Sequence, residues 1–334
     1  MRNVIDVLYY FSFFNYSPTF EEIYTFLKKK CSKRHLARIL EKMEKKGDNI
    51  RRMTNNKLQI TNQTQIINDK NKKTVGGLIT EARYTLGEYS IKITDQSLKI
   101  KNTIQKIKKV KNYIKLLSFF PQIKLVGLSG TVAMMNTEES DDIDLFIISA
   151  RNRLFTGRFI SVMLANLFGI KRKRDEAKTI FSLSRGPAEG EVRLSCDKNC
   201  VAESHNNKDK VCLNLFFDEK NMMVPKRKQT EYVAHEVLQM KPLIAKNDIY
   251  QRFLAANRWV FRIFPNAQQI TNFKFQISNQ FSNFKFQISN FVGDRVEQLL
   301  KKLQLYFINR HRTTEIITPS QLWFHPEDFG KRLH

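Results

Sequence analysis

The sequence predicts an α+β fold with a helical unit at the start of the chain and a helical region at its end. Apolar residues recur every three or four positions over 4–11, 36–43 and 100–117, which is helical spacing. Apolar, β-branched and aromatic runs at 143–149 and 211–217 are typical of strands. At 334 residues the chain exceeds one typical domain, so we expect two or three parts.

Composition shifts along the chain divide it into four ranges. We expect a winged-helix-like domain over 1–62, a linker or insertion over 63–96 and an α/β core over 97–242, within which 175–210 is irregular and is predicted to be an insertion. A C-terminal helical region follows over 243–334. It contains the octapeptide NFKFQISN twice, at 272–279 and 283–290, which indicates a duplicated low-complexity insertion over 269–290.

The first range carries the signals of three helices and a hairpin. Thr19 with Glu22 forms a capping box that predicts the start of the second helix, and a third helix is predicted to begin near Ser32. Residues 50–60 are predicted to form a hairpin with Asn55 and Asn56 at its tip. In a winged helix-turn-helix the third helix binds nucleic acid, and its cationic start holds Lys33, Arg34, His35 and Arg38. Packing or dimerisation is the alternative role for this unit.

A basic amphipathic helix is predicted next. Its apolar positions run from Ile100 to Leu117, and lysines without acids fill the remaining face. These cations can guide a nucleic-acid phosphate backbone, and a solvated charged face explains them equally well.

The segment Gly127 to Ile148, GLSGTVAMMNTEESDDIDLFII, is the strongest functional signal. An apolar run ends at Ser129-Gly130-Thr131, a small-residue turn whose backbone N–H groups can approach a triphosphate. Residues two apart on a strand share a face, so a strand over 143–149 makes Asp142 and Asp144 a pair of carboxylates. Oxygen ligands of this kind suit Mg²⁺ bound together with substrate phosphates.

This turn and Asp-x-Asp pair resemble the DNA polymerase beta-like nucleotidyltransferase superfamily, with Thr131 in place of the usual serine. The resemblance implies a nucleotidyltransferase core with a mixed sheet, Mg²⁺ on Asp142 and Asp144, and NTP phosphates on Ser129, Gly130 and Thr131. It also implies a third catalytic carboxylate on a later strand. Asp218, at the end of the predicted strand 211–217, is the candidate, and Asn214 is the neutral alternative.

The chemistry of further side chains suggests additional candidate roles. Arg153 and Arg158, in a helix predicted over 152–170, are candidate ligands of nucleotide phosphates because guanidinium matches phosphate. His235 and Glu236, in a helix predicted over 229–240, are a possible acid–base pair, although a lone helical histidine is more often structural. Cys196, Cys200, His205 and Cys212 match no compact zinc motif, which favours free thiols.

Charge and cysteine content constrain partners and location. The formal net charge is +25, which indicates a polyanionic partner such as RNA, DNA or an anionic membrane surface. The four cysteines and the lack of a signal sequence favour the cytoplasm. The longest apolar run, over 159–170, is too short to span a bilayer, so no transmembrane segment is expected.

These observations predict a Mg²⁺-dependent enzyme that transfers a nucleoside monophosphate from an NTP to a hydroxyl acceptor. The acceptor stays open between nucleic acid, protein and small molecule, although the basic charge disfavours a cationic acceptor. The alternative is a catalytically inactive regulator that binds nucleic acid through the winged helix and the basic helix. The oligomeric state is not predicted.

Overall fold

A mixed six-stranded sheet forms the centre of the molecule. The computed structural model describes residues 1–46, 50–53, 83–86, 93–172, 209–268, 290–310 and 315–324. The strands lie in the order β6-β3-β4-β5-β8-β7. Their bounds are β3 Ile123–Leu128, β4 Ile143–Ser149, β5 Val211–Asp218, β6 Lys241–Ala245, β7 Ile316–Ile317 and β8 Gln321–Trp323. β4 and β5 are parallel and the other neighbours are antiparallel, so the predicted α+β fold with a mixed sheet is confirmed.

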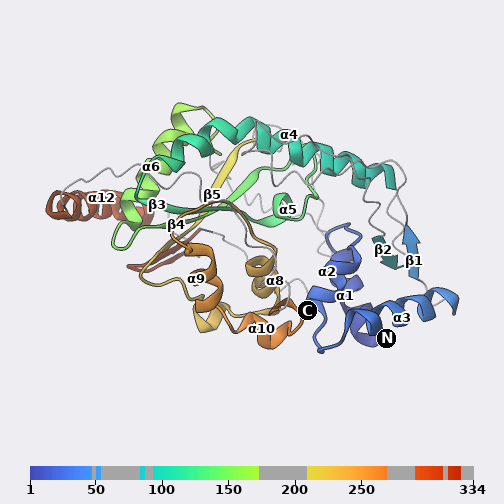
Figure 1. Ribbon diagram of the computed structural model, residues 1–334. Coiled ribbons are helices and arrows are strands. Elements are labelled where there is room, and N and C mark those ends of the chain that lie inside the picture. Colours follow the sequence, from blue (N-terminus) through green and yellow to red (C-terminus); the bar gives the residue numbers. More distant parts are fainter. Residues whose placement is uncertain are drawn as a thin grey trace, which may run out of the picture.

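Helices cover both faces of this sheet (Figure 1). One face packs on α4 (Ile93–Ser118) and α6 (Leu154–Leu167) through a core that includes Tyr113, Ile147 and Phe155. The other face packs on α8 (Glu231–Gln239), α9 (Ile249–Ala256) and α10 (Val260–Ile263). Because side chains alternate along a strand, the apolar residues of β4 divide strictly between the two cores.

The N-terminal unit has three helices and a two-stranded sheet. The bounds are α1 Arg2–Ser12, α2 Phe20–Phe26, α3 Lys33–Lys45, β1 Ile50–Met53 and β2 Arg83–Leu86. The capping box of Thr19 and Glu22 is confirmed, and the Ser32 hydroxyl caps α3 by accepting from the His35 N–H.

The predicted hairpin over 50–60 needs correction. β1 pairs with β2, with Ile50 opposite Leu86, so the partner strand lies in the range predicted to be a linker. The N-terminal unit therefore extends past residue 62. The predicted hairpin tip at Asn55 and Asn56 lies outside the described residues.

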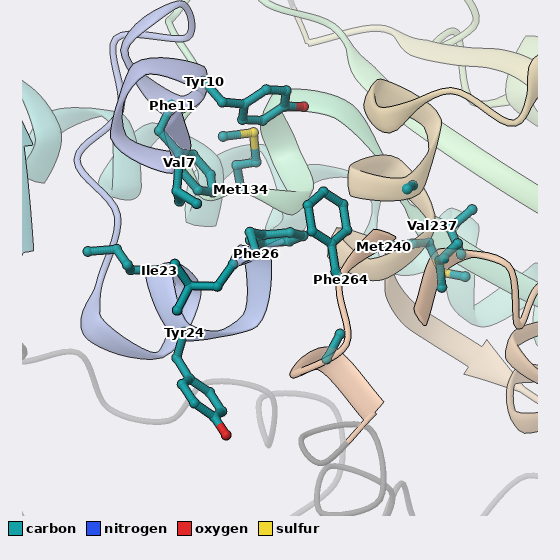
Figure 2. Close-up of a cluster of buried hydrophobic side chains, with 14 of the residues drawn as sticks. Val7, Tyr10, Phe11, Ile23, Tyr24, Phe26, Met134, Val237, Met240 and Phe264 are labelled. Atoms are coloured by element: carbon teal, nitrogen blue, oxygen red, sulfur yellow. The ribbon is translucent and has the colours of Figure 1, made fainter. Parts of the chain in front are cut away.

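The N-terminal unit shares a hydrophobic core with the rest of the chain. Figure 2 shows Phe26 beside Phe264 and Tyr10 beside Met134, with Met240 in the same cluster. The cluster also takes in Phe146 and Ile148 of β4. The N-terminal helices thus extend the layer that covers the α8 face of the sheet.

The range 243–334 is predicted to be a helical region, but it also contains strands. The last three residues of β6 fall in this range, and β8 extends the sheet by pairing with β5. α9 and α10 are separated at Asn257, whose buried amide accepts from the Val224 N–H and donates to the Met222 carbonyl. The remaining elements are α5 (Gly130–Ala133), the short 3-10 helix η3 (Lys226–Lys228) and α12 (Asn290–Arg310), which packs on α6.

Several predicted segments lie outside the described residues. They are the polar stretch 61–73, the segment from 175 to 208 that holds Cys196, Cys200 and His205, and the repeat over 269–289. No helix within the described ranges is both long enough and apolar enough to cross a bilayer.

Candidate active site

The structure brings Asp142 and Asp144 together at the start of β4. Ligand atoms of Asp142, Asp144 and Cys212 all lie within 4.8 Å of one another. Cys212 takes part because β5 runs parallel to β4 and its register places Cys212 opposite Asp144. The group lies on the sheet face that α8 covers, since Asp144 alternates with the core residues Leu145 and Ile147 of the other face.

The predicted glycine turn closes directly on Asp144. β3 ends beside the start of β4, and the Ser129 N–H donates to the Asp144 carbonyl oxygen at 3.1 Å. Gly130 has a φ of +61°, and a Cβ at this position would lie 2.8 Å from Asp144 Oδ2. Glycine is therefore required here for backbone conformation and for the approach of the carboxylate.

The rest of the turn is fixed by hydrogen bonds to the loop before β4. The Thr131 hydroxyl donates to Asp141 Oδ2 at 3.2 Å, and the same carboxylate oxygen accepts from the Glu138 N–H at 2.9 Å. Thr131 therefore positions the loop that carries the acidic residues. From the opposite side, Lys106 of α4 donates to the carbonyl oxygens of Glu139 and Asp141.

Two charged residues outside the predicted site contact it. Arg172 Nη1 lies 2.5 Å from Asp142 Oδ2 and 3.7 Å from Cys212 Sγ. Glu236 Oε2 accepts from the Gly130 N–H at 3.3 Å. In the sequence Arg172 lies in a basic run after α6, and Glu236 is predicted only as a partner of His235.

Burial and like charge perturb the carboxylates. Burial raises the pKa of Asp144 to about 8, and the negative charges of Asp142 and Glu236 act in the same direction. Burial also raises the pKa of Glu236, while the bond from the Gly130 N–H opposes that rise. Three acidic groups thus face one arginine, and a bound cation would lower their pKa values by stabilising the ionised carboxylates.

Asp218 does not complete this cluster. In the parallel pairing it lies opposite Ser149, at the far end of β4 from Asp144, roughly 16 Å away at ordinary strand rise. Its carboxylate accepts from the Lys220 N–H at 2.7 Å and from the N–H groups of Asn152 and Arg153. Asp218 therefore holds the turn between β4 and α6, and the prediction that it lies beside the Asp pair is wrong.

The alternation of side chains along β5 is interrupted. The register with β4 shifts between Asp144 and Phe146. As a result Val211 and Leu213 pack in the core under α4, whereas Leu215 and Phe217 pack in the core under α8. Regular alternation would have placed all four on one face. Asn214, the neutral alternative to Asp218, lies within this irregular stretch.

Arg153 and Arg158 lie at the same far end as Asp218 and bind α12. Arg153 Nη1 pairs with Asp294 Oδ1 at 2.6 Å, and Arg158 Nη1 donates to Gln304 Oε1 at 2.7 Å. The Glu297 carboxylate of α12 accepts from the N–H groups of Phe155 and Thr156, which caps α6. These arginines attach α12 to α6, so the structure does not place them with the predicted phosphate turn.

His235 faces away from the acidic cluster. Its ring stacks on Tyr10 at a centroid distance of 3.6 Å and on Phe26 at 4.2 Å, with Phe264 at its edge. Nδ1 has no hydrogen-bond partner among the described residues, and burial lowers the pKa of His235 well below its usual range. His235 is a packing residue between α8 and the N-terminal unit, and its neighbour Glu236 alone reaches the site.

The donor set fits a divalent cation. Two carboxylates and a thiol converge from adjacent strands, and the turn at Gly130 leaves the carboxylate of Asp144 unobstructed. Comparison with known proteins found no matching family model, no matching curated protein and no matching solved structure.

Proposed function

We propose that the chain is a nucleotidyltransferase that transfers a nucleoside monophosphate from an NTP to a hydroxyl acceptor. The observation that supports this most directly is the convergence of Asp142 and Asp144 at the start of β4, with the Gly130 turn closing on Asp144. Such a site joins a cation-binding carboxylate pair to a backbone turn that accommodates phosphate, and phosphoryl-type transfer depends mainly on positioning and charge neutralisation.

The residues take the following roles in this proposal. Asp142 and Asp144 hold a divalent cation, expected from the oxygen pair to be Mg²⁺, which neutralises charge on the phosphate oxygens. The turn Ser129, Gly130 and Thr131 lines the phosphates, and the Gly130 N–H, which now donates to Glu236, turns to a phosphate oxygen and releases that carboxylate. Arg172 supplies a guanidinium that suits phosphate oxygens, in the role first assigned to Arg153 and Arg158.

The chemistry is a displacement at the α-phosphorus. The acceptor oxygen forms a bond to phosphorus, the bond to the bridging oxygen breaks, and pyrophosphate leaves. We assign the proton of the acceptor hydroxyl to Glu236, because its carboxylate borders the turn and its pKa is raised by burial, which makes it a stronger base.

Label transfer tests this proposal. The full chain is incubated with α-labelled ATP, CTP, GTP or UTP, with Mg²⁺ or Mn²⁺, and with pooled RNA, protein or small-molecule acceptors. We expect transfer that Asp144→Asn lowers by at least about 100-fold, the loss seen when one stabilising group is removed from a site. Asp6→Asn, an exposed change on α1, is the matched control. Transfer that Asp144→Asn leaves unchanged contradicts the assignment.

A regulator that binds nucleic acid without catalysis is the second candidate. The observation that favours it is the outer face of α3, where Arg34, Arg38 and Lys42 are all exposed. Binding through phosphates weakens steeply with salt. This candidate predicts that Arg34→Glu with Arg38→Glu abolishes salt-sensitive binding of RNA or DNA, while no nucleotide is turned over under any condition.

A further inference from the structure

Cys212 is a buried thiol that belongs to neither hydrophobic core. Its side chain is 5% exposed, yet the neighbouring Val211 packs in the core under α4 and Cys212 does not. Its sulfur instead contacts polar groups: it hydrogen-bonds the Asp144 carboxylate and lies 3.7 Å from Arg172 Nη1. A cysteine that served only to fill space would be expected among apolar side chains.

The register between β4 and β5 fixes this position. Asp144 and Cys212 are direct partners on adjacent parallel strands, so both side chains project from the same face. Asp142 precedes Asp144 by two residues and joins them, with all three ligand atoms within 4.8 Å. A tetrahedral ion with ligand bonds of about 2.0 to 2.3 Å needs ligands roughly 3.5 Å apart, so small side-chain rotations suffice.

The ligand types decide which ions such a site prefers. Carboxylates suit Mg²⁺ and Mn²⁺, whereas a thiolate selects zinc and other softer ions. Three protein ligands with one position left for water or substrate are typical of catalytic zinc sites. In this chain the thiol lies where the resemblance implied a third carboxylate.

We propose that Asp142, Asp144 and Cys212 form one three-ligand site that binds Zn²⁺ and other thiophilic divalent ions more tightly than Mg²⁺. The inference rests on the cation site of the proposed function and changes the ion expected there. On binding, the sulfur forms a bond to the metal and its proton passes to the buffer. Arg172, which now pairs with Asp142, gives way to the ion and becomes available to a phosphate.

Cobalt spectroscopy tests the inference without nucleotide. Co²⁺ replaces Zn²⁺ in such sites, and its bond to a thiolate gives a charge-transfer absorption band in the near ultraviolet. The full chain is prepared with Cys31, Cys196 and Cys200 changed to serine, which leaves Cys212 as its one thiol. We expect a band that saturates near one Co²⁺ per chain, that Zn²⁺ abolishes and that a large excess of Mg²⁺ leaves intact.

Matched variants in this background assign the ligands. Cys212→Ser should abolish the band and leave the circular dichroism spectrum unchanged. Asp144→Asn should weaken Co²⁺ binding by at least about tenfold, because loss of a residue that only hydrogen-bonds a metal ligand already costs that much. Cys212→Asp should reverse the preference and bind Mg²⁺ without a band. This last variant keeps the test decisive if the serine variant fails to fold.

The failure of this inference is distinguishable from failure of the proposed function. Absence of a band in the chain that retains Cys212, or displacement of Co²⁺ by an equal concentration of Mg²⁺, overturns the inference. Nucleotide transfer with Mg²⁺ that Cys212→Ser leaves unchanged would then keep the function. A Cys212-dependent band together with no nucleotide transfer under any condition would overturn the function and keep the metal site.

Discussion

Gly130 is the residue on which the geometry of the candidate site depends most directly. It adopts a φ of +61°, and the position of its absent Cβ is 2.8 Å from Asp144 Oδ2. A side chain here has two separate effects. It strains the backbone, at a cost of about 1 to 2 kcal/mol, and it displaces a carboxylate.

We predict that Gly130→Ala lowers both stability and cation binding. Gly169→Ala is the matched control, because Gly169 has a φ of +64° and no atom within 4 Å of its Cβ position. Both variants should lose similar free energy of unfolding in urea. Only Gly130→Ala should lose Co²⁺ affinity, by about tenfold or more. Equal affinities in the two variants would show that Asp144 does not act at this turn.

His235 makes the stability of the fold depend on pH. Unfolding frees the imidazole to bind a proton at its usual pKa near 6.5, whereas the folded chain keeps it neutral to a lower pH. The unfolded state therefore binds more protons below that pH, and the free energy of unfolding falls by up to about 1.4 kcal/mol per pH unit as the pH decreases. The nearby charges are Lys28, which lowers the pKa further, and Glu236 and Glu231, which face Tyr10.

We predict that His235→Phe removes this dependence. Phenylalanine keeps a ring between Tyr10 and Phe26 and has no unpaired Nδ1. In urea titrations the variant and the natural chain should have similar stability at pH 7.5. The variant should become the more stable of the two as the pH falls below 6.5. Parallel stability curves over this range would mean that His235 is protonated in the folded chain.

At the scale of elements, α4 holds the loop that leads to the acidic pair. The Lys106 amine is almost fully buried, and it donates to the Asp141 carbonyl at 2.6 Å and to Asp209 Oδ1 at 3.1 Å. It is the inward-facing member of a helix whose other lysines mostly face solvent. The sequence predicts one charged face for all of these lysines, because helical spacing alone does not show which loop packs against Lys106.

We predict that Lys106→Met destabilises the chain by about 1 to 3 kcal/mol, because the carbonyls of Glu139 and Asp141 lose this donor and Asp209 keeps only its pairing with Lys109. Lys108→Met, on the exposed side of α4, should change stability by no more than about 0.5 kcal/mol. Urea unfolding followed by circular dichroism measures both. Equal effects would show that the helix face, and not the buried amine, contributes the stability.

Local signals predicted local structure well. The capping box at Thr19, the cap at Ser32 and the turn before the Asp pair all rest on contacts between residues close in sequence, and each was recognised. Pairings between distant segments were not recoverable. The partner of β1 lies at 83–86, beyond a long polar stretch that was taken as a linker.

The parallel register between β4 and β5 accounts for the errors at the candidate site. The sequence does not show which end of β5 lies beside Asp144, so the only carboxylate in the predicted strand, Asp218, was chosen over Cys212. The helix after β4 then returns along the sheet. That return brings Arg172, from the end of the helix, to the site and leaves Arg153, from its start, far away.

At the scale of the whole molecule, the N-terminal unit and the candidate site are parts of one packed layer. Phe14, just after α1, accepts through its carbonyl from the Asn136 amide at 2.6 Å, and Asn136 follows the turn that closes on Asp144. On α8, His235 packs on the N-terminal unit while its neighbour Glu236 reaches Gly130. A change in the N-terminal unit therefore has two short routes to the site.

We predict that the N-terminal unit and the sheet unfold together. Both tryptophans, Trp259 and Trp323, lie outside the N-terminal unit, so their fluorescence reports only on the rest of the chain. Phe26 is 3% exposed and contacts His235 and Phe264, and Phe26→Ala should cost about 3 to 5 kcal/mol. If the layer is one cooperative unit, this change lowers the urea midpoint seen by tryptophan fluorescence as much as the midpoint seen by circular dichroism.

Tyr9→Ala, exposed on α1, is the control for Phe26→Ala and should move neither midpoint appreciably. A Phe26→Ala chain whose tryptophan midpoint stays in place would instead make the N-terminal unit an independent domain, and neither route from it to the turn at Gly130 would then act.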